Sequence, residues 1–262
     1  MRGLFKFFLL VVVVVTLMIH HFILNLLLRK GPRKLRILSK SVGRYCRLSN
    51  KILGLKINSD LKPEQSQGLL IISNHMSYLD ILVLSSVYPT LYVTSVEMKE
   101  TLFLGQVCSL CACLFTERRK GKRTAMTMKK DIGDIGELLS LGFSTTIFPE
   151  GTSTNGMGLL PFKTTLLESA IATQKKILPI AIGYTHIDGK AFDNTNNDIV
   201  CWHGDTNFFI HLLGLVKAHE VRVKIKIAHA ISPLELKDRY NLGKISEKMI
   251  SELYQQMKWE NL

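Results

Sequence analysis

The feature that most constrains this chain is a stretch of 22 residues near its amino terminus, Phe7 to Leu28, that contains no Asp, Glu, Lys or Arg. A helix of that length covers about 33 Å, which is enough to cross the apolar core of a bilayer. A cleaved signal peptide is the alternative, because Arg2 and Lys6 provide a basic start. The run is long for a signal peptide, however, and basic residues rather than a small-residue cleavage site follow it. The stretch therefore predicts a membrane anchor over residues 1–31.

Three polar residues interrupt this apolar stretch, namely His20, His21 and Asn25. These residues are compatible with a helix that crosses the membrane and equally with a segment that enters one leaflet and turns back. The sequence leaves both arrangements open.

Residues 32–60 are predicted to form a basic amphipathic membrane-surface segment that starts at Pro32, a favoured residue in the first turn of a helix. At 100° per residue its basic side chains fall within about 80° of one another, opposite an apolar side. The basic side consists of Arg33, Arg36, Lys40, Arg44 and Arg47, and the apolar side of Leu35, Leu38, Val42 and Tyr45. A helix packed on the protein with its basic side in water would show the same pattern. The position beside an apolar stretch favours contact with anionic lipid headgroups.

The net charge of +13 is concentrated at this end of the chain. Residues 1–60 contain 12 Lys and Arg and a single acid, Asp60, whereas residues 61–262 contain 22 basic and 20 acidic residues. The body is therefore nearly neutral, and no nucleic-acid partner is expected. Eight basic residues between Arg29 and Arg47 outnumber those before the apolar stretch, which predicts that the body lies on the inner, cytoplasmic face of the membrane.

The five cysteines are too few for a disulfide-stapled scaffold, and cytoplasmic thiols are normally reduced. Cys108, Cys111 and Cys113 lie in an apolar run without a nearby His, and no second Cys pair completes a zinc site. We expect buried core thiols, no metal site and no other cofactor.

Residues 61–262 are predicted to form one α/β domain with a mostly parallel central sheet flanked by helices, because short apolar runs alternate with longer helical segments. A polar connector over residues 56–68 precedes it. The final apolar run alternates cleanly, which is typical of an edge strand with one face in water. Strands are expected at 69–73, 91–95, 113–116, 145–148, 177–183 and 221–228, and helices at 77–87, 122–141, 162–173 and 245–258.

Active sites of such sheets gather at the carboxyl ends of strands, and the first strand ends in an unusual sequence. His75 and Asp80 lie five residues apart across the turn from strand to helix. An imidazole beside a carboxylate is the arrangement of a general base, since the carboxylate fixes the tautomer and stabilises the imidazolium. The alternative is structural, because Ser77 and Asp80 also fit the spacing of a helix capping box.

Two further segments carry polar groups directly after strands. Phe148 to Thr152, with the sequence FPEGT, offers an acid, a glycine and a hydroxyl that could hold an anion, or it is an ordinary turn. Phe115 to Arg123 has five cations in its last six residues, which suits phosphate binding or a solvated loop.

The order and content of these segments resemble the membrane-associated glycerolipid acyltransferases of the 1-acyl-glycerol-3-phosphate acyltransferase type. The matching residues are Asn74, His75 and Asp80 for the first motif, Phe115 to Arg118 for the second, FPEGTST from Phe148 for the third, and Leu178-Pro179-Ile180 for the fourth. Two positions depart from the family pattern. Ala112 replaces a glycine before the second motif, and Ser153 replaces an arginine in the third.

The resemblance implies transfer of an acyl chain from a thioester, on coenzyme A or acyl carrier protein, to the free hydroxyl of a lysolipid. It implies His75 as the base and Asp80 as the residue that orients it, both as catalytic residues, with Arg118 holding the acceptor phosphate. It places the other substrate-binding residues at Asn74, Phe115, Glu150, Gly151, Thr152 and Pro179. We further expect Lys120, Lys122 and Arg123 to contact the donor carrier.

The first acceptor that the resemblance implies is 1-acyl-glycerol-3-phosphate, which would give phosphatidic acid in phospholipid biosynthesis. The third-motif variant and the segment Trp202 to Asp205 are similar to a bacterial subgroup that acylates lyso-ornithine lipids, which is the alternative. The segment itself matches no catalytic motif, and a structural or acceptor-shaping role is expected for it. A membrane-tethered lipid-binding protein would leave His75 and Asp80 without a role. A covalent hydrolase lacks support because no G-x-S-x-G nucleophile turn is present.

Overall fold

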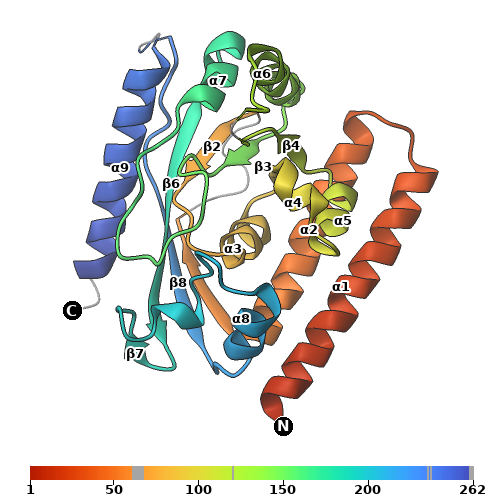
Figure 1. Cartoon of the computed structure of the whole chain (residues 1–262), viewed down its shortest axis with the longest axis vertical. Helices are drawn as coiled ribbons and strands as arrows, with labels where there is room; N and C mark the ends of the chain where they lie inside the picture. The colour runs from red at the N-terminus through yellow and green to blue at the C-terminus, as the bar shows by residue number, and fades with distance from the viewer. Residues whose placement is uncertain (61–67, 120, 235, 237, 260–262) are drawn as a thin grey trace.

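The computed structural model describes residues 1–60, 68–119, 121–234, 236 and 238–259, and Figure 1 shows the arrangement of its elements. The α-helices are α1 (Arg2–Leu27), α2 (Pro32–Leu53), α3 (Leu79–Val87), α4 (Val96–Glu100), α5 (Leu104–Leu110), α6 (Ala125–Ser140), α7 (Glu168–Thr173), α8 (Phe208–Leu215) and α9 (Arg239–Trp259). The strands are β1 (Leu55–Ser59), β2 (Leu70–Ser73), β3 (Leu91–Ser95), β4 (Leu114–Thr116), β5 (Thr145–Ile147), β6 (Ile177–Ile187), β7 (Lys190–Ala191) and β8 (Val221–Ile227).

The central sheet has the strand order β1-β8-β6-β2-β5-β3-β4, with β7 paired to the end of β6. Strands β6, β2, β5, β3 and β4 run parallel, whereas β8 is antiparallel to β6 and parallel to β1. The predicted mostly parallel sheet flanked by helices is confirmed. β2 and β5 are buried along their whole length, as expected for central strands covered on both faces.

The predicted edge strand and the predicted connector were both wrong in part. Residues 55–59 form β1, which pairs with β8, so β8 is second from the edge and the sheet begins before residue 61. The alternation of β8 still reflects one wet face, because Val221 is buried and Arg222 is exposed. The polar composition of β1 hides a strand whose formation depends on a distant partner. Residues 61–67 of the connector lie outside the described residues.

Several other element boundaries differ from the sequence prediction. The helix expected from residue 162 starts with a 3-10 turn at Thr165–Leu167 and continues as α7, α9 starts at Arg239, and β6 continues to Ile187. Helices α4, α5 and α8 were not predicted, because each has only five to eight residues and no clear apolar periodicity.

Helices cover both faces of the sheet. α9 packs against β6 and β8, and α6 packs against β4, β5 and α7. On the other side α3 packs against α2, which in turn packs against α1, so that α1 and α9 form opposite sides of the molecule (Figure 1). The amphipathic helix expected from Pro32 is confirmed as α2. The five residues of its predicted basic side are exposed, and its opposite side packs on α1 and the domain.

Helix α1 is long and apolar enough to cross a membrane, with a mean hydropathy of 2.7 over its best window. It does not stand free of the domain, however. Lys6 donates hydrogen bonds to the backbone carbonyls of Leu53 and Ala218, and His21 bonds Ser41 of α2 and the carbonyl of Leu110. One side of α1 is therefore fastened to the domain near both of its ends. The other side exposes a continuous apolar stripe made of Leu4, Phe5, Phe8, Val11, Val12, Val15, Ile19, Phe22, Ile23, Leu26 and Leu27.

Candidate active site

The turn after β2 places His75 and Asp80 in direct contact. His75 Nδ1 lies 2.8 Å from Asp80 Oδ2, and the imidazole is 19% exposed while the carboxylate is fully buried. The ring of Phe148, at the end of the neighbouring strand β5, stacks on the imidazole with 4.0 Å between ring centroids. The imidazole is thus held on one side by a carboxylate and on one face by an aromatic ring. Its Nε2 atom remains available for a proton.

Asp80 accepts four hydrogen bonds, which stabilise its buried negative charge. Besides His75, the backbone N–H groups of Met76 and Ser77 donate to Oδ2 at 2.7 and 2.9 Å, and the Tyr184 hydroxyl donates to Oδ1 at 2.7 Å. Burial, together with the Asp80 charge, raises the pKa of Tyr184 well above its usual range, so this hydroxyl stays a donor. The carboxylate is fixed from the turn, from β6 and from the imidazole at once.

The structural alternative for this turn, a capping box, is only half present. Asp80 does accept a hydrogen bond from the Ser77 N–H group. The Ser77 hydroxyl, in contrast, is buried without a hydrogen-bond partner among the described residues, and Tyr78 rather than Ser77 is the N-cap residue of α3. The alternative in which Ser77 caps the helix was therefore wrong, because α3 begins one residue later than that spacing requires.

Glu150 of the third motif joins the two strand ends. Its carboxylate, 2% exposed, accepts hydrogen bonds from the N–H groups of His75 and Leu160, each at 2.7 Å. The backbone of His75 is thereby tied to the loop after β5. Burial raises the pKa of Glu150 from 4.5 to about 6, although both hydrogen bonds favour the charged form.

This raised pKa predicts a specific pH dependence of stability. A carboxyl group that binds its proton more tightly in the folded than in the unfolded protein stabilises the fold most at pH values below its unfolded pKa. The free energy of unfolding should therefore fall by about 2 kcal/mol as the pH rises from about 4.5 through about 6. We expect Glu150→Gln to lack this decrease. Thermal unfolding of both proteins in detergent across that pH range measures it.

Glu247→Gln is the matched control, because Glu247 also accepts a backbone hydrogen bond, from Phe162, but is only half-buried. It should retain the wild-type pH dependence. The same decrease in wild type and Glu150→Gln would contradict the assignment to Glu150.

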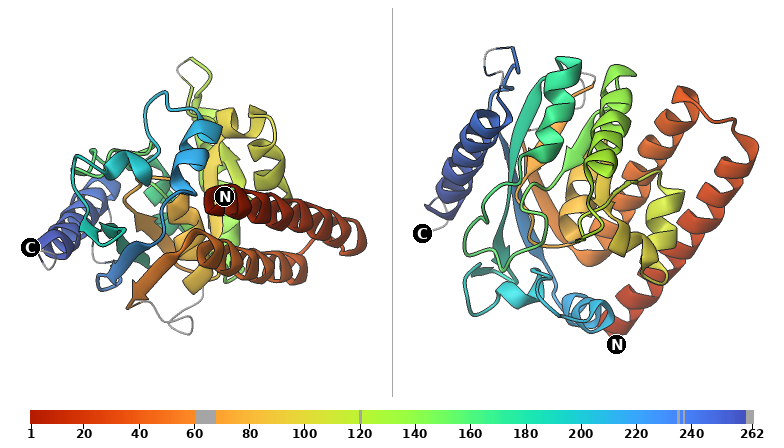
Figure 2. Two further views of the ribbon diagram at one scale, coloured as in Figure 1. Left: turned by 90° about the horizontal axis from the view of Figure 1, so that it is seen from below. Right: turned by 45° about the horizontal axis from the view of Figure 1, so that its top comes forward.

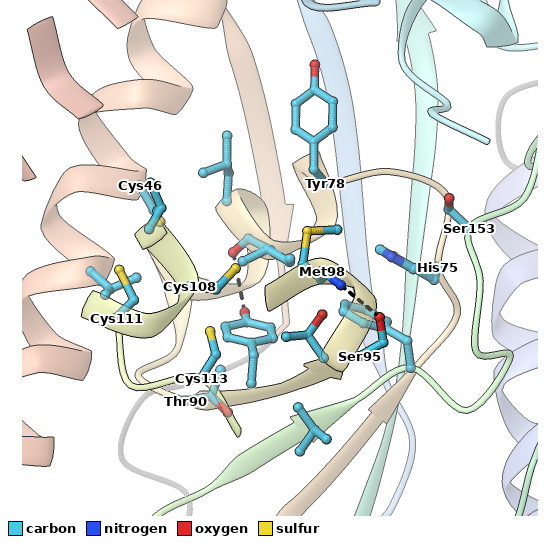
Figure 3. Close-up of a pocket in the computed structure, with 18 of the residues that line it drawn as sticks. Cys46, His75, Tyr78, Thr90, Ser95, Met98, Cys108, Cys111, Cys113 and Ser153 are labelled. Carbon is cyan, nitrogen blue, oxygen red and sulfur yellow. Dashed lines mark hydrogen bonds between the residues drawn. The ribbon is translucent and has the colours of Figure 1, made fainter. Parts of the chain in front are cut away.

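His75 lies in the wall of an elongated cavity of about 370 Å³ that reaches from the turn to the amino-terminal helices. Figure 3 shows His75 and Ser153 at one end and Cys46 and Cys111 at the other. Its wall is mainly apolar and comes from α1, α2, α3, β3 and α5, including Val13, Leu17, Val42, Ile81, Leu82, Val93 and Val107. Such a cavity suits a long apolar ligand.

A smaller polar pocket of about 160 Å³ adjoins the cavity, and Arg118, Phe148 and Gly151 line both. Arg118 Nη1 donates to the Gly151 carbonyl at 3.3 Å, and Nε to Thr116 Oγ1 at 3.3 Å. Burial lowers the pKa of Arg118, and no carboxylate within the described residues forms a salt bridge with it. Lys163 also lines the pocket. Its Nζ lies so close to Gly151 that a Cβ atom added at residue 151 would be 2.4 Å from it. Glu117 and Asp131 line the pocket as well, and Glu117 is already paired with Arg119. Because the cations Arg118, Arg123 and Lys163 outnumber these two acids, the pocket can hold an anion.

The structure brings together only some of the site residues expected from the sequence. His75, Arg118, Gly151 and Thr152 line the cavity. Asn74, Phe115, Glu150 and Pro179 line neither the cavity nor the polar pocket. The Asn74 amide is used instead to bond both backbone groups of Ile182, and Pro179 lies in β6 beside Ile72. The substrate-binding roles of these four residues stay predictions.

Residues that the sequence did not single out complete the site, above all Tyr184 and Lys163. Neither residue stands in a recognisable sequence motif. Tyr184 contacts Asp80 across 104 positions, and Lys163 lies in the loop before the 3-10 turn. The segment from Trp202 docks on the same turn, as the Trp202 N–H donates to the Met76 carbonyl at 2.9 Å and Ser153 Oγ donates to the Trp202 carbonyl.

The expectation that the clustered thiols are core residues was wrong for Cys108, Cys111 and Cys113. All three are half-buried, and they line the cavity together with the buried Cys46. Cys201 is buried as well. The departure at Ala112 also has a structural meaning. Its φ of 60° is in the left-handed region, where a glycine avoids a cost of about 1–2 kcal/mol.

Comparisons with known proteins agree with this geometry. Residues 56–183 match the Acyltransferase family. The chain is 31% identical to the lyso-ornithine lipid O-acyltransferase of Rhizobium meliloti (strain 1021), over 71% of this chain and 64% of that protein. It is 30% identical to the 1-acyl-sn-glycerol-3-phosphate acyltransferase of Neisseria gonorrhoeae, over 75% of this chain and 73% of that protein.

A solved structure shares the fold across nearly the whole chain. The crystal structure of the 1-acyl-sn-glycerophosphate acyltransferase from Thermotoga maritima superposes with a TM-score of 0.67 and 15% sequence identity, covering 98% of this chain and 94% of that one. This likeness shows the fold, and the family match together with the Neisseria relative shows that the chain belongs to the acyltransferase family that contains these lysolipid acyltransferases.

Proposed function

We propose that this enzyme transfers an acyl chain from a thioester to the hydroxyl of a lysolipid, with His75 as general base. The observation that carries this proposal is the imidazole, bonded to a buried carboxylate, in the wall of an apolar cavity that adjoins an anion pocket. The cavity suits the acyl chain and the pocket suits the headgroup. The acyl chain and the headgroup of a lysolipid would thus occupy two adjoining pockets that share Gly151 in their walls.

The geometry supports a direct transfer without an acyl-enzyme intermediate. The acceptor oxygen attacks the thioester carbonyl carbon while His75 Nε2 takes the hydroxyl proton, and Asp80 stabilises the imidazolium that forms. The C–S bond then breaks, and the imidazolium returns the proton to the departing thiolate. The products are an ester and a free thiol. Ser153 is not placed as a nucleophile, because its hydroxyl donates to the Trp202 carbonyl.

The acceptor headgroup is proposed to bind at Arg118, because this half-buried guanidinium forms no salt bridge with a carboxylate of the described residues and would be stabilised by an anionic ligand. Lysophosphatidate, which would give phosphatidic acid, is the first candidate, and the Neisseria relative supports it. A lyso-ornithine lipid is the second. It is favoured by the Rhizobium relative and by Ser153 at the place of the family's arginine.

Removing the guanidinium should weaken acceptor binding strongly. Loss of a hydrogen bond to a charged group costs about 1.5–3 kcal/mol, so Arg118→Ala should raise the KM for the acceptor by about 10- to 150-fold, with a smaller effect on kcat. Arg119→Ala is the matched control, because Arg119 is already paired with Glu117 and Glu100. Product mass spectrometry with purified protein, an acyl thioester and a panel of lysolipids measures both variants.

The same measurement tests the proposed function itself. Formation of a diacyl product supports acyl transfer, whereas release of free fatty acid alone would identify a hydrolase, and no turnover with any lysolipid would leave a lipid-binding protein. Equal acceptor KM values for wild type and Arg118→Ala would show that the headgroup binds elsewhere.

The donor is proposed to be acyl-CoA or an acyl carrier protein. Lys122 and Arg123 are exposed beside the polar pocket and could contact either acidic carrier, while Lys120 lies outside the described residues. No resident cofactor is proposed.

We place the enzyme on the membrane, with its domain on the cytoplasmic face, as the basic residues after α1 favour. Because α1 is fastened to the domain near both ends, a perpendicular crossing would carry the exposed cations of the adjoining α2 into the bilayer core. An arrangement in which the apolar stripe of α1 enters one leaflet avoids this cost.

A further inference from the structure

Helix α8 presents an apolar face to the outside of the molecule. Phe209, Ile210 and Leu213 are exposed by 55%, 70% and 45%, whereas His211 and Leu215 on the other side are buried. No Asp, Glu, Lys or Arg occurs from residue 207 to residue 216. Large apolar side chains gathered on one helix face, rather than scattered over a surface, indicate an interaction site.

The position of α8 indicates what covers this face. α8 contacts the amino-terminal end of α1, where Gly3 lies against the backbone of Val216, and the two helix ends lie side by side in both views of Figure 2. At this end α1 exposes Phe5 and Phe8, each by 61%. The apolar face of α8 therefore lies next to the exposed apolar stripe of α1, which suits contact with lipid.

Cations border this surface where α8 meets α1. Arg2 precedes the stripe of α1 and Lys217 follows α8, and both side chains are exposed, while the acid Asp205 is exposed before the other end of α8. Cations at the margin of an apolar surface are attracted to anionic lipid headgroups while the apolar side chains enter the acyl boundary.

We propose that α8 is a second membrane-binding element, whose exposed face enters the bilayer beside the amino-terminal end of α1. The occupant of this face is a lipid surface that contains anionic lipids.

This placement would bring the wall of the cavity close to the lipid. His211 Nδ1 lies 3.0 Å from the hydroxyl of Tyr78, and the ring of Phe208 packs edge-on against Tyr78 with 5.0 Å between centroids. Tyr78 lines the cavity together with His75. If the proposed function holds, a lysolipid would have only a short path from the bilayer to the base.

Photo-crosslinking of the full chain tests the proposal directly. A benzophenone-bearing phenylalanine analogue is placed at Phe209, at Phe8 as the positive control, and at Tyr240 as the matched negative control. Tyr240 is exposed to the same degree as Phe209, by 56%, but lies on α9 at the opposite side of the molecule (Figure 1). The proteins are irradiated on vesicles made of equal parts of phosphatidylglycerol and phosphatidylethanolamine.

We expect lipid adducts at Phe209 and Phe8 and none at Tyr240, detected by mass spectrometry. Adducts at Phe8 but not at Phe209 would overturn the proposal. Crosslinks from Phe209 to a second copy of the chain would do the same, because they would make α8 an interface between protein molecules.

An activity measurement adds a second, separate readout. Phe209→Ser with Ile210→Ser should lower turnover of lysolipid in vesicles by about tenfold, because apolar side chains lose their contact with lipid, and should leave turnover in detergent unchanged. Equal losses in both media would contradict the proposal. If the wild type has no acyltransferase activity, the proposed function fails, whereas the crosslinking result stands by itself.

Discussion

Replacing His75 with alanine is expected to lower kcat for acyl transfer by about 10²- to 10⁴-fold, the usual contribution of a general base. The fold should survive, because Asp80 keeps its hydrogen bonds from Met76, Ser77 and Tyr184 when the imidazole is absent. The acceptor KM should change little, since the cavity wall and the polar pocket remain. Steady-state kinetics with purified protein, together with circular dichroism to confirm folding, measures this result.

His203→Ala is the matched control for this experiment. His203 also contacts an aspartate, with Nε2 at 3.3 Å from Asp198 Oδ1, but it does not line the cavity. We expect wild-type kcat for this variant. Unimpaired turnover by folded His75→Ala protein would defeat the assignment of the base.

Replacing Asp80 with asparagine should lower kcat by a comparable factor and should also reduce stability. The carboxylate accepts from two backbone N–H groups, an imidazole and a tyrosine hydroxyl, whereas an asparagine amide presents a donor where one of its oxygens stood. A buried hydrogen-bonding group without a partner costs about 1–3 kcal/mol. The imidazole would also lose the group that fixes its tautomer.

Activity per folded molecule separates the two roles of Asp80. If the carboxylate only caps α3, Asp80→Asn lowers the melting temperature but leaves kcat of the folded protein unchanged, which would contradict the catalytic assignment. Tyr184→Phe is the comparison, because it removes a single donor and leaves the contact between His75 and Asp80 in place. We expect it to retain most of the activity.

Helix α1 has a second structural role, because it forms part of the cavity. The sequence predicts an anchor separate from the domain, but Val13 and Leu17 of α1 form part of the cavity wall. A chain that lacks α1 would lose part of this wall as well as its lipid contact. Helix α1 thus contributes to the wall of the proposed acyl site in addition to its proposed attachment to the membrane.

Local patterns in the sequence by themselves determined much of this protein. The charge-free stretch predicts α1, the basic stripe after Pro32 predicts α2, and short apolar runs predict the central strands, because each element leaves a local pattern of apolar and polar residues in the sequence. The contact between His75 and Asp80 was also predictable. A separation of five residues across a single turn leaves the two side chains within reach of each other.

The tertiary structure alone decided which distant groups complete the site. Tyr184 reaches Asp80 across 104 positions, Glu150 reaches the backbone of His75 across 75, and β1 becomes a strand only by pairing with β8. None of these contacts leaves a periodic signal, because a hydrogen bond between distant residues constrains each of them singly and not its neighbours in sequence. The order of strands and the packing of α1 on the domain bring them together. The sequence therefore identified the pair of His75 and Asp80, and the fold supplied the groups that support this pair, the cavity beside it, and Arg118, which forms no salt bridge among the described residues.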